Sequence, residues 1–339
     1  EYVRAHDFRR YLHKNLEDFI IETPLENPLD FLNKEFDSSL VKVMQNKWAP
    51  YNFQSQDIDE FLANLNIDKS VETSSIRGGY SNALKQLNKF IKVGYQDYAK
   101  YRSDPSKEAS SKLSPYFHHG QISTHEVFEK ISELESWSPE FVNPKMVGRR
   151  EGWWGSSNNF ESFMDELITW RELGYHTCVR RANYNQYSSL PEWAIKTLDE
   201  HSSDEREHIY SLDELTYSQT HDEIWNAAQN QLRTQGVIQN YLRMLWGKKI
   251  LEWTPNPQIA LSYMITLNDR YSLDGRDPNS YSGVFWILGR YDRAWGPERS
   301  IFGKIRYMTS DSTARKFNLK PYLEEWGNEA IGIFSSVSK

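Results

Sequence analysis

The sequence predicts an all-α protein, and three observations support this class. Apolar residues recur at spacings of three and four, as in the series Ala83, Leu84, Leu87, Phe90 and Ile91, which is the period of one buried helix face. No segment shows convincing alternation of apolar and polar residues, the pattern of a half-buried strand. Signals for helix starts and stops separate the periodic segments.

Each element follows from a local signal. Gly78-Gly79 opens the helix that carries the series above, and Ser114 followed by Pro115 is typical of a helix start. The other expected segments are, in chain order, an apolar set at 61–67, a polar break at 72–77, a loop at 137–157, helices at 160–179, 192–201, 236–253 and 261–268, a loop at 274–278 and a short apolar run at 284–288.

Composition limits the class of protein. The chain has 339 residues, 38% of them apolar, which is enough for a sizeable core. No stretch approaches the roughly 20 apolar residues of a membrane span. Cys178 is the only cysteine, which excludes internal disulfides and cysteine-cluster metal sites and favours a reducing compartment. We therefore expect no metal and a cytoplasmic location, nucleoid-associated in a bacterium and nuclear or organellar in a eukaryote.

Charge is unevenly distributed along the chain. The net charge of −7 argues against a nucleic-acid binder. Residues 290–320, however, hold eight basic side chains against three acidic ones. Such a segment can bind phosphates while the rest of the surface is acidic, or it can be a solvated charged face, and charge alone does not decide between the two.

Tryptophan is abundant, with 12 residues. Trp246 and Trp253 lie seven residues apart in one expected helix, which places them on one face about 10 Å apart, and Trp225 precedes them. Closely spaced indoles can pass an electron, but a stripe of core residues gives the same pattern.

Two sets of polar residues lie in suggestive positions. Ser110, Ser111 and Ser114 precede a helix start, where hydroxyls and free N–H groups can bind phosphate, although serine clusters also mark plain loops. Glu166 and Trp170 share a helix face at i and i+4, which suits hydrogen bonding to a base beside a stacking indole, or an exposed Glu over a core Trp.

Arg243 and Asn268 lie in or beside the most apolar helices. A buried Arg requires an anionic partner. That partner is either a protein carboxylate such as Asp274 or an anionic cofactor ring. Alternatively, the side chain packs on its helix and the guanidinium reaches water.

The order of these segments resembles the photolyase/cryptochrome family. Residues 110–123 (SSKLSPYFHHGQIS) resemble its flavin-phosphate segment, and residues 163–173 (FMDELITWREL) resemble its substrate helix. Several further segments resemble class II cyclobutane pyrimidine dimer photolyases, namely 225–229, 242–253, 267–278 and 302–308. The resemblance covers roughly residues 98–316.

The resemblance implies an all-helical domain that holds a U-shaped FAD, active as reduced FADH⁻. In such enzymes the flavin, excited by blue or near-ultraviolet light, gives one electron to a flipped-out dimer in UV-damaged DNA, the cyclobutane ring splits, and the electron returns. Arg171 and Arg243 should flank the flavin, and Asn268 should face its N5 edge. The full set of implied cofactor-binding residues is Tyr98, Arg102, Ser110, Ser111, Leu113, Ser114, Phe163, Arg171, Arg243, Asn268, Asp274, Gly275 and Asp277.

The resemblance also implies a substrate site and an electron path. Glu166 is then the carboxyl that contacts the dimer, Trp170 and Trp286 form an aromatic wedge around it, and Met244 packs beneath. Arg290 and Arg306 would contact DNA. The implied photoreduction chain is Trp246, Trp225 and Trp253, with Trp246 nearest the flavin.

The sequence departs from the class II pattern at several positions. Trp170 stands where many members have Arg, Arg290-Tyr291 replaces an x-His pair, and His118-His119 replaces a more usual His-Phe. The α/β antenna domain expected before the catalytic domain has no counterpart here, so a second chromophore has no evident site. We expect a helical connector at 1–75 and the FAD-binding catalytic domain at 76–330.

Two other functions remain open. A cryptochrome-type photoreceptor would keep FAD and the tryptophans but signal to a partner, and a (6-4) photoproduct photolyase would use active-site histidines, for which His118 and His119 are the nearest candidates. The residues implied to contact the pyrimidine dimer, namely Glu166, Trp170, Trp286 and Met244, favour repair. We also expect the protein to be a monomer that does not bind membranes.

Overall fold

The computed structural model describes residues 2–16, 19–20, 24–25, 27, 29, 38–49 and 58–328. The chain divides into two compact units, one formed by Glu1–Ile21 with Thr73–Lys339 and a smaller one formed by Glu22–Glu72. In the smaller unit the described helices are α3 (Ser38–Lys47) and α4 (Ile58–Asn64). The predicted division into a connector and a catalytic domain at residue 75 stays a prediction.

The predicted all-α class is confirmed over the described residues, where β structure is limited to isolated bridges. The α-helices of the larger unit are α1 (Ala5–Asn15), α5 (Tyr80–Lys89), α6 (Tyr98–Tyr101), α7 (Ser114–His118), α8 (Thr124–Leu134), α9 (Asn158–Met164), α10 (Arg171–Arg180), α11 (Glu192–Glu200), α12 (Leu212–Thr216), α13 (Glu223–Gln235), α14 (Asn240–Glu252), α15 (Pro257–Tyr271), α16 (Pro278–Ile287), α17 (Ser310–Lys316) and α18 (Lys320–Trp326). Two π-helices, η2 (Phe90–Gly94) and η6 (Asp165–Trp170), and three-residue 3₁₀ turns at η3 (Tyr95–Asp97), η4 (Pro139–Phe141), η5 (Pro144–Met146) and η7 (Tyr187–Ser189) complete them.

The helix predicted at 236–253 begins later than expected. Gly236 is left-handed (φ 77°) and ends α13, a conformation that glycine adopts without steric cost. Gln239 then caps α14, because its side-chain oxygen accepts hydrogen bonds from the N–H groups of Tyr241 and Leu242. The apolar period of the sequence runs across this break and therefore did not reveal it.

The short apolar run at 284–288 is the end of a full helix rather than a separate element. Asp277 caps the start of α16 by accepting a hydrogen bond from Asn279 N–H at 2.8 Å, and Pro278 occupies the first turn. Asp followed by Pro is a helix-start signal, so the predicted loop at 274–278 ends in a cap. This missed signal lies beside the candidate site.

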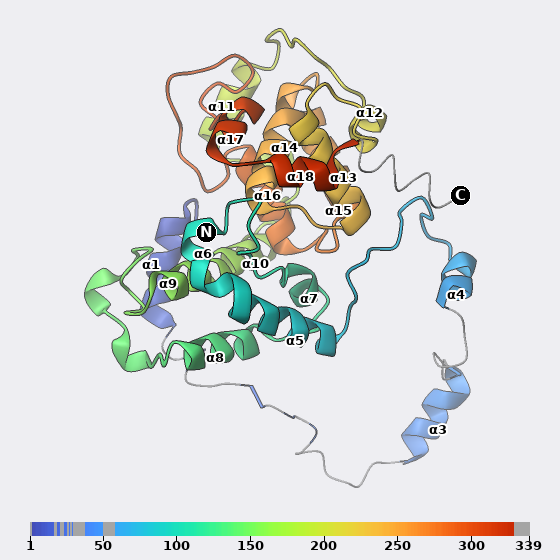
Figure 1. Ribbon diagram of the computed structural model, residues 1–339, viewed down its shortest axis with the longest axis vertical. Helices are drawn as coiled ribbons and strands as arrows, with labels where there is room; N and C mark the ends of the chain where they lie inside the picture. The colour runs from blue at the N-terminus through green and yellow to red at the C-terminus, as the bar shows by residue number, and fades with distance from the viewer. Residues whose placement is uncertain are drawn as a thin grey trace. The chain divides into compact units, whose positions relative to one another are not determined.

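The helices of the larger unit form two groups (Figure 1). One group, α5 to α9, surrounds an aromatic core that includes Phe90, Trp137 and Phe160. The other contains α13, α14, α15 and α16, which pack on one another. Helix α10 packs closely against α16, and Gly174 permits this approach because it has no side chain. A Cβ at this position would lie 3.1 Å from the carbonyl oxygen of Pro278 and closer still to two side chains.

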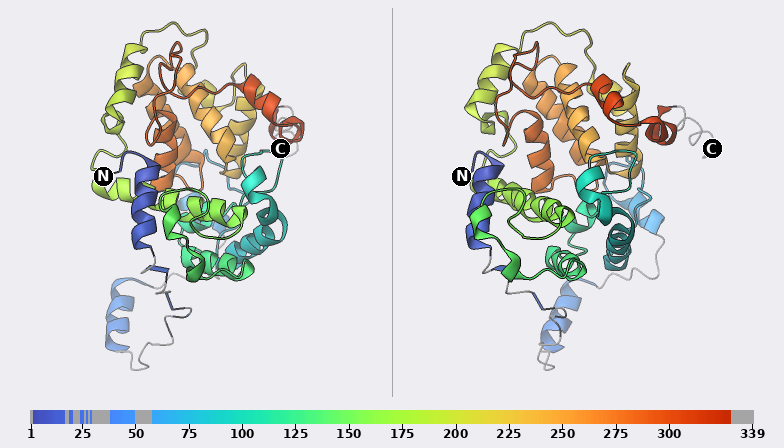
Figure 2. Two further views of the ribbon diagram at one scale, coloured as in Figure 1. Left: turned by 90° about the vertical axis from the view of Figure 1, so that its left-hand side faces the viewer. Right: turned by 60° about the vertical axis from the view of Figure 1, so that its left-hand side comes forward.

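Helix α1 lies against the segment that contains η6, and Figure 2 shows it running alongside the green helices of that region. Arg9 of α1 forms a buried ion pair with Asp165 of η6. The sequence grouped this helix with the connector, but it packs within the larger unit because this ion pair and Phe8 are buried there.

Candidate functional site

A cluster of polar side chains joins α7 to α14, α15 and the loop before α16. Nη1 of Arg243 donates a hydrogen bond to Oδ1 of Asn268 at 3.2 Å, and its Nη2 lies 3.6 Å from Oδ1 of Asp274. Nδ1 of His118 lies 3.2 Å from Oδ2 of Asp277. We call Ser114, His118, Arg243, Asn268, Asp274 and Asp277 the polar cluster.

The side chain of Asn268 is fixed in orientation. Its oxygen accepts from Arg243, and its amide nitrogen donates to the hydroxyl of Ser280 in a short hydrogen bond. Only 3% of Asn268 is exposed, and its buried amide is satisfied by these two partners together with Oδ1 of Asp269, which lies 3.4 Å from the amide nitrogen. Ser280 was not predicted from the sequence, because its role depends on α16 packing beside α15.

Gly275 permits the tight approach of the loop to α15. A Cβ at this position would lie 2.8 Å from the carbonyl oxygen of Asn268 and 2.9 Å from that of Ser272. The small residue therefore keeps Asp274 and Asp277 close to the end of α15. Its function in this loop is steric.

Asp274 is a charged member of the polar cluster. Burial alone would raise its pKa, but the guanidinium of Arg243 and hydrogen bonds from Ser272 and Ser114 together bring the pKa below its usual value. The bond from Ser114 joins the serine segment at 110–114 to the loop at 274–277. The structure thus brings together two of the predicted cofactor segments.

The other serine-segment residues have mixed surroundings. Leu113 is fully buried in the core. The backbone carbonyl of Ser111 accepts a hydrogen bond from Gln86 at 2.8 Å, and Ser110 is half-buried. Helix α7 begins at Ser114 with Leu113 at the cap position, one residue before the predicted cap.

Tyr98 and Phe163 lie in the core rather than at the polar cluster. Their rings meet edge to face with centroids 5.2 Å apart. Arg171 forms an ion pair with Glu172 and lies over the ring of Tyr175, 4.6 Å from its centroid.

Two tryptophans predicted to contact the substrate belong to one apolar cluster. Trp170 and Trp286 are both half-buried and pack on a group that contains Phe8, Leu173 and Tyr291. The rings of Trp170 and Tyr291 meet edge to face with centroids 6.3 Å apart. Residues from α1, α10 and the segment after α16 therefore form the base of this aromatic wall.

Glu166 lies in the π-helix η6 and not in an α-helix. A π-turn is wider than an α-turn, so the predicted i, i+4 geometry with Trp170 does not apply unchanged. Oε1 of Glu166 accepts a hydrogen bond from Nη1 of Arg102 at 2.6 Å. Two residues predicted for different roles, one for the dimer and one for FAD, thus form an ion pair.

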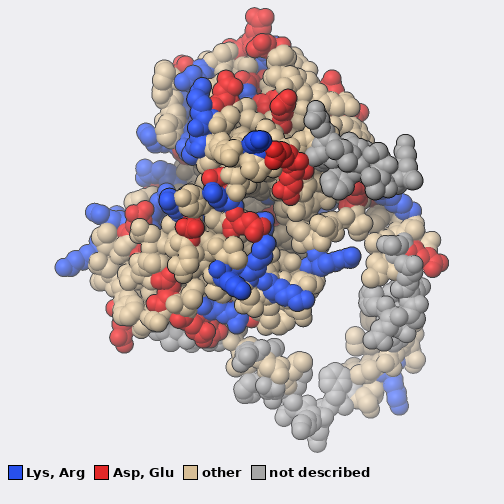
Figure 3. All heavy atoms as spheres, viewed as in Figure 1, with Lys and Arg blue, Asp and Glu red and all other residues tan. Residues whose placement is uncertain are grey.

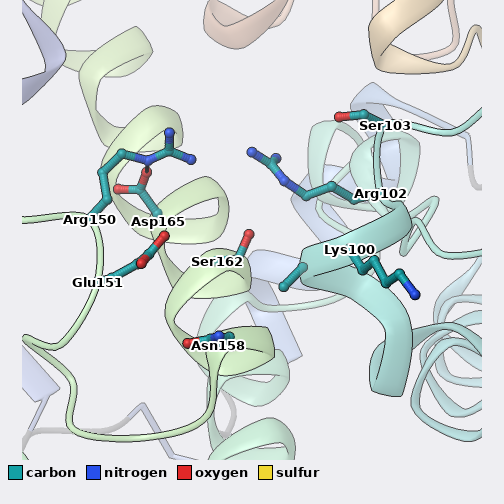
Figure 4. Close-up of a pocket in the computed structure, with 9 residues that line it drawn as sticks. Lys100, Arg102, Ser103, Arg150, Glu151, Asn158, Ser162 and Asp165 are labelled. Carbon is teal, nitrogen blue, oxygen red and sulfur yellow. Dashed lines mark ion pairs between the residues drawn. The ribbon is translucent and has the colours of Figure 1, made fainter. Parts of the chain in front are cut away.

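A polar hollow of about 460 Å³ lies beside this pair. Figure 4 shows Arg102 on one side of it and Arg150 with Asp165 on the other. Its remaining polar lining residues are Lys100, Ser103, Glu151, Asn158 and Ser162. The sequence did not predict this hollow, because its sides come from α6, α9, η6 and the loop before α9.

The three predicted electron-chain tryptophans are buried in the second helix group. Nε1 of Trp225 donates to the carbonyl oxygen of Trp246 at 3.0 Å, and Nε1 of Trp246 donates to Oε1 of Gln229 at 2.9 Å. The rings of Trp225 and Trp253 have centroids 5.7 Å apart. Trp225 therefore contacts both of the others.

The predicted DNA contacts differ in accessibility. Arg306 is exposed and lies 5.7 Å from the ring centroid of Trp286 and 5.0 Å from that of Trp295. Arg290 is only 4% exposed, and it donates to the carbonyl of Tyr184 and to the hydroxyl of Ser189. The DNA contact predicted for Arg290 stays a prediction; in this structure its guanidinium joins the segment after α16 to the segment at 184–189.

Other site neighbours were not anticipated from the sequence. Gln239 donates to the carbonyl of Arg102 at 2.9 Å and so links this segment to α14. Lys248 is 1% exposed, donates to the carbonyl of Ile287, and lies 5.6 Å from the ring centroid of Trp286. Met244 is half-buried. A lysine in an apolar helix gives no signal of burial.

Known proteins resemble this chain in sequence and in fold. The deoxyribodipyrimidine photo-lyase of Methanothermobacter thermautotrophicus is 40% identical over 268 residues, which cover 79% of this chain and 55% of that protein. The protein of the same name from Potorous tridactylus is 39% identical over 279 residues, covering 80% of this chain and 49% of that one. The chain belongs to the photolyase/cryptochrome family. It spans about half the length of the curated relatives it matches.

The family fold is also found in a solved structure. A bacterial class III photolyase from Agrobacterium tumefaciens superposes with a TM-score of 0.56 and 18% identity, over 80% of this chain and 50% of that one. No protein-family model matches the chain. Within the described ranges no helix has the length and apolar character to cross a membrane, and no three His, Cys, Asp or Glu side chains are arranged to hold a metal ion.

The polar cluster fits the flavin cofactor of this photolyase/cryptochrome family. Arg243 supplies a cation, Asn268 an oriented amide, and the exposed residue Ser114 a hydroxyl that also bonds to Asp274. These are the donors that an anionic ring system and phosphates require. That these residues hold the cofactor stays a prediction.

Proposed function

We propose that this chain carries out light-driven repair of cyclobutane pyrimidine dimers in DNA, in the manner of class II photolyases. The observation that carries the proposal is the shared apolar cluster of Trp170 and Trp286, two half-exposed indoles from distant parts of the chain. Curated relatives named deoxyribodipyrimidine photo-lyase support it. Repair would occur at the aromatic wall that includes Trp170 and Trp286, beside Glu166.

FAD is the proposed cofactor, in its fully reduced form. When bound, it supplies one electron under blue or near-ultraviolet light. Arg243 and Asn268 would hold its ring system, and Ser114 and the neighbouring serines would hold its phosphates. The buried carboxylate of Asp274 keeps the Arg243 guanidinium in place, so the cation is oriented before the cofactor binds.

The remaining predicted cofactor residues would support this site indirectly, by shaping its loop or by packing in the core. Asp277 and Gly275 shape the loop that carries Asp274. Tyr98 and Phe163 are buried together, so they would act through packing. The predicted direct contact with FAD stays a proposal for these residues and for Arg102 and Arg171.

Trp170 and Trp286 would receive the flipped-out dimer. Stacking of a base on an aromatic ring contributes about 1–3 kcal/mol, and a dimer already weakens base pairing, so flipping it costs less than flipping an intact base. Glu166 would accept or donate a hydrogen bond at the base edge. Arg102 holds this carboxyl at 2.6 Å and thereby limits the directions in which it can point. Met244 would pack beneath the dimer.

Arg306 would bind the DNA backbone beside the dimer. Its guanidinium lies over the rings of both Trp286 and Trp295, which holds it near the aromatic wall. Lys and Arg side chains are interspersed with Asp and Glu on the face shown in Figure 3. Phosphate binding would therefore depend on local groups such as Arg306 and not on the net charge of −7.

Trp246, Trp225 and Trp253 would deliver electrons that reduce the flavin. Trp225 bridges the other two through its hydrogen bond and its ring contact. Tyr210 and the more exposed His221 lie 5.5 Å and 5.2 Å from the Trp253 ring centroid. The path would thus run from the buried core toward the surface.

The decisive experiment is a repair assay. The reduced, FAD-loaded protein is illuminated with an oligonucleotide that contains a thymine dimer, and the return of thymine absorbance is followed. We expect recovery that depends on light. An oligonucleotide with a (6-4) photoproduct should show none.

Glu166→Ala tests the substrate role within the same assay. We expect slower repair with FAD retention close to that of the wild-type protein. The matched control is Glu129→Ala, an exposed glutamate of α8, which should repair normally. Normal flavin binding without any repair in the wild-type protein would overturn the proposal.

A further inference from the structure

Two consecutive carboxylates in η6 form ion pairs with arginines from different parts of the chain. Asp165 accepts two hydrogen bonds from Arg9, to Oδ1 from Nε at 2.6 Å and to Oδ2 from Nη2 at 2.9 Å. The next residue, Glu166, pairs with Arg102 of the segment after α6. The rotation of this one helical turn is therefore set by two separate arginines.

The pair between Arg9 and Asp165 is almost completely buried. The exposed fractions of the two side chains are 5% and 4%. A planar guanidinium bound by both carboxylate oxygens fixes direction as well as distance. The pair between Arg102 and Glu166 is more open, at 22% and 34%, which suits a group that meets a substrate.

The π-helical turn that carries both carboxylates is contacted by residues from another helix. Asp165–Trp170 is a π-helix between α9 and α10, and π-turns are rare insertions that often occur at functional sites. Arg9 reaches this turn from α1, which is 156 residues distant in sequence. The same α1 supplies Phe8 to the cluster beneath Trp170.

One member of each pair, Arg102 and Asp165, lines the same hollow. Figure 4 shows Asp165 on the side opposite Arg102, and Arg150 adds a third, weaker interaction at 3.6 Å from Asp165. Arg150 is 60% exposed, so its attraction to Asp165 is screened by water. Arg9 is therefore the principal partner of Asp165.

We propose that Arg9 is a positioning residue for the repair site, because its bidentate pair with Asp165 fixes the π-turn that directs Glu166 toward Arg102 and the dimer. This inference rests on the proposed function. Arg9 touches neither substrate nor cofactor in this scheme. It acts through Asp165 on the direction of the Glu166 carboxyl.

The test separates positioning from stability by changing both partners together. Arg9→Met alone leaves Asp165 charged and poorly paired, which destabilises the fold. The double variant Arg9→Met with Asp165→Leu replaces the pair by apolar side chains, an exchange that proteins often tolerate. The matched control is Arg4→Met with Asp7→Leu, which removes an exposed ion pair from the same helix.

The first measurements are thermal unfolding, FAD content and repair by the pre-reduced protein. We expect the buried-pair double variant to keep its fold and its FAD but to repair about tenfold more slowly, since small displacements of a positioned group reduce rates by such factors. The control double variant should repair normally. Wild-type repair by a folded buried-pair variant would overturn the proposal.

A double-mutant cycle with Glu166→Ala identifies the route of the effect. If Arg9 acts through Glu166, the loss caused by the buried-pair change should nearly vanish when Glu166 is already Ala. A purely structural role would give losses that multiply in the combined variant, and this result would overturn the proposal.

Amide hydrogen exchange gives a readout that does not depend on repair. Residues 165–170 should exchange faster in the buried-pair variant than in the wild-type protein or the control. Absence of repair by the wild-type protein would be a failure of the proposed function alone, because exchange still reports whether Arg9 holds the π-turn. Unchanged exchange would contradict the positioning role in either case.

Discussion

The indole nitrogen of Trp225 donates a hydrogen bond to the backbone carbonyl of Trp246 across 3.0 Å. The two residues lie on neighbouring helices, α13 and α14, which pack on each other. The bond holds the ring of Trp225 between the Trp246 backbone and the ring of Trp253. Three tryptophans that look like core residues in the sequence are thus joined in a fixed order.

Replacement of Trp246 by Phe should block photoreduction of oxidised FAD while repair by pre-reduced protein stays nearly normal. The phenyl ring keeps most of the packing but is a much poorer electron donor. Flavin absorbance under illumination with an external reductant measures the effect. Trp137→Phe is a matched control, since Trp137 is also buried and its indole nitrogen also donates a hydrogen bond, to the carbonyl of Trp154 where that of Trp246 donates to Gln229. Normal photoreduction in Trp246→Phe would show that the electron path is wrong.

Lys248→Met should change how stability depends on pH. Burial lowers the pKa of Lys248 to about 7 in the fold, while Asp292 partly opposes and Arg306 adds to this shift, and the unfolded value is about 10.4. At a pH between these two pKa values, Lys248 carries a proton in the unfolded chain but not in the folded chain. The free energy of unfolding should therefore rise with pH across this window, by at most about 1.4 kcal/mol per unit.

Urea unfolding at pH 7, 8 and 9 tests this expectation. The Lys248→Met variant should show a flatter profile than the wild-type protein, because the group that gains the proton on unfolding is gone. Lys196→Met, at a side chain that is 77% exposed, should follow the wild-type profile. Parallel profiles for the wild-type and Lys248→Met proteins would contradict the lowered pKa.

Asp274→Asn should weaken FAD retention and lower stability by about 1–3 kcal/mol, because Arg243 loses its charged partner. The pKa of Asp274 lies below its usual value in the fold, so its contribution to stability is present above about pH 4 and is lost as pH falls through the folded value. FAD release on dilution and acid unfolding measure the two effects. If the variant holds FAD as tightly as the wild-type protein, the polar cluster does not bind the flavin.

Gly174→Ala should destabilise the protein by about 1–3 kcal/mol through overpacking. The new methyl group would meet Oδ1 of Asn279 at 2.8 Å and Oγ of Ser282 at 2.9 Å. Gly283→Ala is the control on α16, because nothing lies within 4 Å of its Cβ position, and it should stabilise by about 0.5–1 kcal/mol. Thermal unfolding of both variants tests the packing of α10 on α16. Equal midpoints would contradict the close approach.

Sequence by itself determined the helical class and most helix positions, since these depend on the spacing of apolar residues and on local caps. The sequence-based predictions were wrong where a local cap signal competed with the apolar pattern. Gly236 ends a helix within a continuous apolar pattern, and Asp277 with Pro278 starts one where the sequence predicts a loop. The order of the motifs along the chain also indicated the family, because the order and spacing of motifs can be read from the sequence alone.

Only the tertiary structure decided which predicted residues meet. It joined Ser114 to Asp274, buried Arg290 between loops and paired Glu166 with Arg102. It also brought Arg9 to Asp165 from a helix that the sequence assigned to a connector. Such contacts depend on where whole helices cross, and helix crossings are set by packing between distant segments rather than by the local pattern of either one.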